Sequence, residues 1–109
     1  MPEKAVRPEG GVHMRKYELM YIINASMDDA ARQEVMENLK TIVEDGKGSV
    51  SEVTEMGMRE FAYEINHMTK GYYVLMYFEA DVDTVVELER QMRLNNKIVR
   101  HMNVKLEEE

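Results

Sequence analysis

The sequence predicts one α+β domain whose four strands and two helices follow the order β-α-β-β-α-β. Four segments are rich in β-branched and aromatic residues, which is typical of strands. Two segments between them repeat apolar residues at intervals of three and four, which is typical of amphipathic helices. The chain has 109 residues, of which 44% are hydrophobic and 32% charged, so it can form one core. We expect this domain at 14–106, between a flexible arm at 1–13 and an acidic end at 107–109.

The first half of the predicted order begins with a strand at 15–24, which is apolar on both faces toward its end. Ser26 is expected to be the N-cap of the helix that follows, with acidic residues in the first turn, where the helix dipole favours anions. The apolar face of this helix is formed by Ala31, Val35, Leu39 and Ile42, while Arg32, Glu34, Glu37 and Lys40 are expected to face solvent. Gly46 is expected to end the helix as a C′ glycine.

A long hairpin follows. Residues 49–65 are expected to form one strand with a kink near Gly57, since a glycine inside a strand pattern indicates a bulge or bend. Its partner strand is predicted at 72–79, after a polar connector at 66–71. This second strand is apolar on both faces, so we expect it inside the sheet, with one face covered by the chain or offered to a partner.

The second helix is expected to be capped by Asp81 and to end at Asn95, because asparagine tolerates the left-handed conformation. A last strand follows at 98–106. The complete order predicts the split βαβ, or ferredoxin-like, arrangement, in which a four-stranded antiparallel sheet carries both helices on one face. We expect the first strand to neighbour the last only at a distance. The uncovered face should carry an apolar patch, which often marks an interaction surface.

Composition disfavours several classes of protein. The chain contains no cysteine, which excludes disulfides and thiolate metal sites. It has no apolar run of 18 residues, so we expect no membrane span. Residues 1–13 lack the apolar segment of a signal peptide, and a cytoplasmic location is therefore expected.

The sequence offers little for catalysis. It has no Gly-rich phosphate loop, no Gly-x-Ser-x-Gly motif and no histidine pair at metal-binding spacing. We interpret His13, His67 and His101 as ordinary surface residues. A small hydrolase on this fold would need an arginine in the loop at 24–27, which has none. We therefore expect no enzyme activity, cofactor, metal or small-molecule substrate.

Charge is distributed unevenly along the chain. The net charge of −7 argues weakly against nucleic-acid binding. Residues 90–106, however, contain no acidic residue and form a basic stripe made of Arg90, Arg93, Lys97, Arg100, His101 and Lys105. This basic stripe either complements the dipole of the second helix or contacts phosphates.

Four segments are specific in combination: MRKYELMYII at 14–23, GMREFAYEI at 57–65, KGYYVLMYFEA at 70–80 and ELERQMRLNNKIVRHM at 87–102. Together they resemble the small ribosomal subunit protein six family of bacteria, over residues 14 to about 104. The resemblance implies a structural role rather than an enzyme. It also implies binding to the central domain of small-subunit ribosomal RNA, as a heterodimer with a basic partner, small-subunit protein eighteen.

The resemblance, together with the basic stripe, suggests two sets of contacts. The candidate RNA contacts are Arg15, Lys16, Tyr17, Arg59, Arg93, Lys97 and Arg100. The candidate partner contacts are Met20, Ile22, Tyr63, Tyr73, Leu75 and Tyr77. The family often has Trp-Gly-Lys-Arg-Arg near the kink, where residues 56–60 are Met-Gly-Met-Arg-Glu, so only one cation remains there. The alternative hypothesis is a regulatory or scaffolding module that dimerises through its open sheet face.

Overall fold

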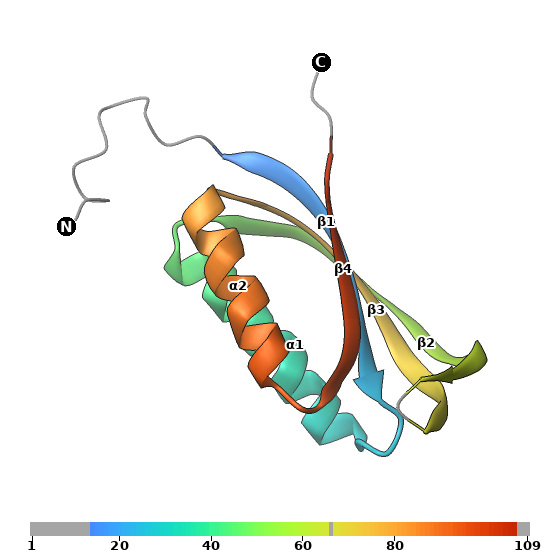
Figure 1. Cartoon of the computed structure of the whole chain (residues 1–109). Coiled ribbons are helices and arrows are strands. Elements are labelled where there is room, and N and C mark those ends of the chain that lie inside the picture. The colour runs from blue at the N-terminus through green and yellow to red at the C-terminus, as the bar shows by residue number, and fades with distance from the viewer. Residues whose placement is uncertain (1–13, 66, 107–109) are drawn as a thin grey trace.

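The computed structural model describes residues 14–65 and 67–106, and the predicted arm at 1–13 and acidic end at 107–109 lie outside them. Six elements follow one another in the predicted order (Figure 1): β1 (Arg15–Asn24), α1 (Asp29–Asp45), β2 (Ser49–Ile65), β3 (Met68–Ala80), α2 (Val82–Leu94) and β4 (Ile98–Lys105). All strand pairs are antiparallel, and both helices cover the same face of the sheet. The chain therefore has the predicted ferredoxin-like fold.

The strand order is β2-β3-β1-β4, so the first and last strands are direct neighbours. Met20 lies opposite Met102, and the Leu106 amide donates to the Lys16 carbonyl at 2.8 Å. The expectation that these strands lie apart is wrong. Strand β1 pairs with β3 on one side, which leaves its other edge free. The crossover connection through α2 places β4 at that edge.

The hydrophobic core lies between the sheet and the helices. Alternate side chains of β1 and β3 point into it, and Tyr17 stacks on Phe78 with ring centroids 5.3 Å apart. The helices contribute buried residues at intervals of four, namely Val35, Leu39 and Val43 of α1 and Leu88 and Met92 of α2. The apolar faces that follow from the 3.6-residue period of the helices and the two-residue period of the strands thus pack into a single core.

The helix starts depend on two aspartates. The Asp81 carboxylate accepts a hydrogen bond from the Thr84 amide at 2.9 Å, as predicted for the cap of α2. In α1 the cap is Asp28, which accepts from the Ala31 amide at 2.9 Å. The prediction of Ser26 as cap is wrong, because its amide and hydroxyl both donate to the Asn24 side chain in the turn after β1.

Both helices end near the predicted residues, but for different physical reasons. Gly46 has a φ of −87°, and the left-handed conformation is taken by Lys47, with a φ of 69°. A glycine is needed at 46 because an added Cβ would collide with the Thr84 side chain of α2. Asn95 also has a negative φ, −90°, and instead its side chain accepts a hydrogen bond from the Lys97 amide.

The β2–β3 hairpin extends beyond the rest of the sheet, toward the lower right in Figure 1. Gly57 adopts a φ of 92° where the pairing register shifts, which confirms the predicted kink. Strand β3 begins at Met68, earlier than the predicted 72, yet its pairing with β1 stops at Gly71. The outer part of the hairpin therefore projects past the end of β1.

Candidate partner and nucleic-acid interface

We call the sheet face opposite the helices the open face, and the strand register determines which residues lie next to one another on it. Met20 of β1 lies opposite Leu75 of β3, and Ile22 lies opposite Tyr73. Because directly opposed residues of antiparallel strands share a face, the register brings five of the six candidate partner contacts onto the open face. These are Met20, Ile22, Tyr73, Leu75 and Tyr77.

Sequence reasoning missed how far the apolar surface continues onto β4. Met102 lies opposite Met20 and is 56% exposed, and Val104 lies opposite Glu18 and is 45% exposed. Their alternation with Arg100 was visible in the sequence. Their place beside β1 depends on pairing between distant segments, which the alternation cannot reveal.

Ile22 is only 5% exposed although no helix covers it. Strand β3 has a glycine, Gly71, beside it, and an added Cβ there would meet both Ile22 and the Phe61 ring. Phe61 lies on the projecting part of β2, with its ring centroid 6.3 Å from that of Tyr73. The hairpin thus folds an aromatic side chain onto one end of the open face.

Tyr63, the sixth candidate partner contact, is 75% exposed. It lies farther out on the projecting hairpin than Arg59, which is opposite Gly71 in the last row that β3 shares with β1. The structure therefore separates Tyr63 from the apolar patch around Met20.

The opposite end of the open face is polar. The Tyr77 hydroxyl donates to a Glu18 carboxylate oxygen at 2.9 Å, and this hydrogen bond raises the pKa of Tyr77 above its usual value of 10.0. Glu52 lies opposite Tyr77 on β2, and Glu79 lies opposite Lys16 on β1. Lys16, Glu52, Tyr77 and Glu79 line a hollow of about 300 Å³.

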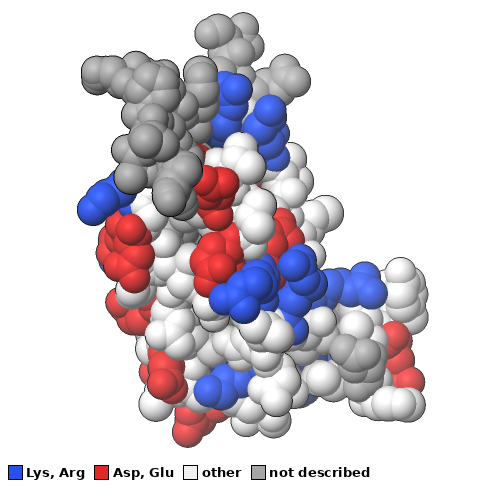
Figure 2. All heavy atoms as spheres, turned by 60° about the vertical axis from the view of Figure 1, so that its left-hand side comes forward, with Lys and Arg blue, Asp and Glu red and all other residues white. Residues whose placement is uncertain are grey.

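The candidate RNA contacts occupy several surfaces. Arg59 and Arg100 lie at the hairpin end of the open face, whereas Lys16 lies at its polar end. Arg15 precedes Lys16 on β1 and belongs to the opposite face. Lys97 lies in the turn between α2 and β4. Figure 2 shows lysine and arginine atoms gathered at centre right and scattered elsewhere over this side, with carboxylates between them.

The basic stripe is partly neutralised by acidic residues of α2. Arg90 makes two hydrogen bonds to the Glu87 carboxylate, at 2.9 and 3.0 Å, and these bonds lower the pKa of Glu87 to about 2. Arg93 lies 3.8 Å from Glu89, which also contacts His101 at 3.0 Å. Arg93 is 62% exposed and its pair with Glu89 is long, so it can exchange this partner for a phosphate.

Tyr17 differs from the other candidate RNA contacts because it is buried. It is 7% exposed, and its ring stacks on Phe78 inside the core. This position does not fit a stacking contact with a base, and the ring instead helps to hold β1 against β3.

Comparison with known proteins decides the family. Residues 16–105 match the family model described as Ribosomal protein S6. The chain belongs to the ribosomal protein S6 family. The small ribosomal subunit protein bS6 of Exiguobacterium sp. strain AT1b is 43% identical over 92 residues, covering 84% of this chain and 97% of that protein. The bS6 protein of Halalkalibacterium halodurans is 40% identical over 95 residues, covering 87% and 100%.

A solved structure in the same family has the same fold. The crystal structure of 30S ribosomal protein S6 from Thermotoga maritima matches with a TM-score of 0.81 and 36% identity. The match covers 86% of this chain and 89% of that one. The resemblance predicted from the four sequence segments is therefore confirmed for the family and for the fold.

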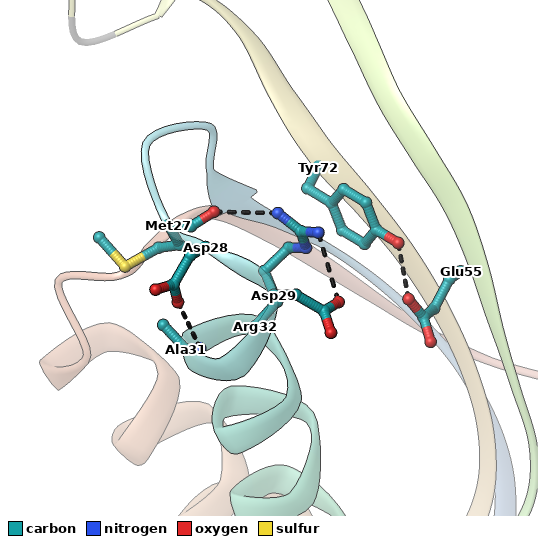
Figure 3. Close-up of polar contacts among 7 residues, drawn as sticks. All are labelled: Met27, Asp28, Asp29, Ala31, Arg32, Glu55 and Tyr72. Carbon is teal, nitrogen blue, oxygen red and sulfur yellow. Dashed lines mark hydrogen bonds and ion pairs between the residues drawn. The ribbon is translucent and has the colours of Figure 1, made fainter.

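In this member of the ribosomal protein S6 family, one polar cluster on the helix face ties α1 to the hairpin (Figure 3). The Arg32 guanidinium lies 4.2 Å from the centroid of the Tyr72 ring and donates to the Met27 carbonyl at 2.9 Å. The Tyr72 hydroxyl donates to Glu55 of β2 at 2.6 Å. The expectation that Arg32 faces solvent is wrong, since the contacts in this cluster leave only 18% of its side chain exposed. It is a structural cluster, separate from the open face.

Within residues 14–65 and 67–106, no group of three or more His, Cys, Asp or Glu side chains could hold a metal ion. No helix in these ranges is long and apolar enough to cross a membrane.

Proposed function

We propose that this chain is a structural constituent of the small ribosomal subunit. In this role it binds the central domain of small-subunit ribosomal RNA together with small-subunit protein eighteen, and it is not an enzyme. Its membership of the ribosomal protein S6 family and its relatives named as small ribosomal subunit proteins support the ribosomal setting. The observation that carries the finer proposal is the open face, whose apolar middle is bordered by Arg59 and Arg100.

Protein contact is assigned to the apolar middle of the open face. Met20, Tyr73 and Leu75 are half-buried in the isolated chain, and Met102 is exposed. A partner on this face would bury them completely, and apolar burial is the main source of affinity in such interfaces. A basic partner also suits a chain with a net charge of −7, because it supplies part of the positive charge that RNA requires.

RNA contact is assigned to the cations around the hairpin end of the open face and the end of α2. These are Arg59, Arg93, Lys97 and Arg100. Arg15 and Lys16 form a second group at the start of β1. Contacts from arginine and lysine to phosphates supply affinity and fix orientation without reading sequence. Because a partner on the apolar middle would border the first group, RNA can contact both proteins at once.

The test is a binding measurement with a fragment of the central domain of small-subunit RNA. The chain is titrated with and without small-subunit protein eighteen, at two salt concentrations. We expect tight, salt-sensitive binding that appears only with the partner. Absence of binding in both cases, with concentration-dependent self-association, would contradict the proposal and support the dimerising regulatory module.

A further inference from the structure

The base of the projecting hairpin contains an interruption in the pairing of its two strands. Glu55 lies opposite Val74 and Gly57 lies opposite Tyr73, so Met56 is an extra residue on β2. Such a bulge breaks the regular hydrogen bonding and bends the strand. Gly57 has a φ of 92°, and no atom of the described residues, apart from its chain neighbours, lies within 4 Å of where a Cβ would be. Strand pairing alone therefore does not fix the direction of the hairpin.

A side-chain hydrogen bond crosses this bulge on the helix face of the sheet. Tyr72 of β3 pairs with Met58, beyond the bulge, whereas its hydroxyl donates to Glu55, before the bulge, at 2.6 Å (Figure 3). Hydrogen bonds to an ionised acceptor are shorter and stronger than those between neutral groups. This one joins the two parts of the hairpin on either side of the kink and so restrains the angle between them.

Arg32 holds the Tyr72 ring from the side of α1. Its guanidinium lies 4.2 Å from the ring centroid, donates to the Met27 carbonyl at 2.9 Å and lies 3.4 Å from the Asp29 carboxylate. A planar guanidinium whose edges are held in this way presents its flat face to the ring. Because only 18% of its side chain is exposed, Arg32 is poorly placed to bind a phosphate itself. It instead connects the base of the hairpin to the start of α1.

Arg59 lies directly beyond this cluster. It is opposite Gly71, in the row that follows the pair formed by Tyr72 and Met58. Arg100 lies on β4, which pairs with β1 and not with the hairpin. A change in the kink would therefore move Arg59 relative to Arg100. Because contacts to phosphates fix how a protein is oriented on a nucleic acid, the spacing between such cations matters for binding.

We infer that Arg32 and Tyr72 are positioning residues, which set the direction of the hairpin and thereby place Arg59 for contact with an RNA phosphate. The inference rests on the proposed function and adds the means by which one RNA contact is placed. Neither residue touches the RNA in this account. Tyr72 acts through its hydrogen bond to Glu55 across the kink, and Arg32 acts by holding the Tyr72 ring.

The test uses Tyr72→Phe, which removes the hydroxyl without changing the charge of the chain. With protein eighteen present, we expect the central-domain RNA fragment to bind about threefold more weakly and with a smaller salt slope, because Arg59 loses part of its phosphate contact. Tyr21→Phe is the matched control, since the Tyr21 side chain lies in the core and its hydroxyl has no hydrogen-bond partner among the described residues. This control should bind RNA as the unmodified chain does. Urea unfolding verifies that each variant folds.

Two further variants show how the effect arises. Arg32→Lys keeps the positive charge but loses the planar guanidinium, and it should weaken RNA binding in the same way as Tyr72→Phe. Adding Tyr72→Phe to Arg59→Ala should cause no further loss of affinity, because the residue that the cluster positions is already absent. A residue that only stabilised the fold would not show this dependence on Arg59.

The outcomes separate the inference from the proposed function. If the unmodified chain with protein eighteen does not bind the RNA, the proposed function is wrong, and the inference with it. If it binds but Tyr72→Phe and Tyr21→Phe behave alike, the inference alone is wrong. A further loss of affinity when Tyr72→Phe is added to Arg59→Ala would also overturn it. Unchanged binding by Arg32→Lys would overturn the role of Arg32, since charge without the flat contact would then suffice.

Discussion

At the scale of single residues, the turn between β1 and α1 shows how neighbouring side chains divide their hydrogen bonds. Asn24 accepts from the amide and hydroxyl of Ser26, so this serine is committed to the turn. Asp28 then accepts from the Ala31 amide and begins the helix. Both residues are common N-caps, and the sequence alone does not show which of them the Asn24 side chain engages.

Replacing the cap that the structure identifies should therefore destabilise the protein more than replacing the predicted one. Asp28→Ala is expected to lower the free energy of unfolding by about 1 kcal/mol, because an amide at the start of α1 loses its acceptor. Ser26→Ala should change it by less than about 0.5 kcal/mol, since only one exposed hydrogen bond is removed. Urea unfolding of both variants provides the measurement, and equal losses would contradict the assignment.

The Tyr77–Glu18 hydrogen bond gives a prediction for pH. The carboxylate stabilises the protonated phenol, so the pKa of Tyr77 is raised above 10.0, and Glu52 adds a smaller repulsion. A raised pKa in the folded state means that this stabilisation is present below pH 10 and is lost as the pH increases further. Glu18→Gln should lower the pKa of Tyr77 toward 10.0, as followed by NMR of its ring. An unchanged pKa would show that the hydrogen bond does not form in solution.

Two individual side chains show why sequence reasoning misjudged exposure. Tyr17 alternates with Lys16, so its place on the core face could be inferred, but the resemblance also made it a candidate RNA contact. Arg32 is charged and lies among residues that face outward, yet its guanidinium covers the Tyr72 ring. That contact joins residues forty positions apart, and an arginine buries its stem readily when such a ring is available.

At the scale of elements, local patterns predicted the strands and helices well. The bounds of β1 and β2 match the prediction, and α2 begins directly after the predicted cap. Errors arise where pairing decides the outcome. Strand β3 starts earlier because β2 continues to pair with it as far as Ile65 and Met68. The neighbouring position of β4 likewise follows from the crossover and not from its own residues.

The projecting hairpin is expected to depend on Phe61. This side chain contacts Tyr73 and lies against Gly71, where it helps to cover Ile22. Phe61→Ala should increase hydrogen exchange at residues 58–61 and 70–73 by about tenfold, since local opening then costs less free energy. Tyr63→Ala, an aromatic residue that is 75% exposed, is the control and should have little effect. Equal effects would mean that Phe61 does not hold the hairpin.

At the scale of the whole molecule, the distribution of charge matters more than its sum. A net charge of −7 suggests a protein that avoids RNA. The fold nevertheless distributes the charges unequally, because the antiparallel register places three carboxylates beside Lys16 at one end of the open face and two arginines at the other. The sequence predicted which residues share this face. Its polarity depends on the strand order, and for that reason only the structure reveals it.

The central claim is that Arg59 and Arg100, at the hairpin end of the open face, contact RNA phosphates while a partner occupies the apolar middle. The most direct measurement is the salt dependence of binding to the central-domain RNA fragment in the presence of protein eighteen. For Arg59→Ala with Arg100→Ala, we predict weaker binding and a log–log salt slope smaller by roughly 1.5, since two phosphate contacts are lost. Lys40→Ala with Arg90→Ala removes two cations from the helices and should leave both quantities unchanged. Equal slopes for the chain and the Arg59 and Arg100 variant would contradict the account.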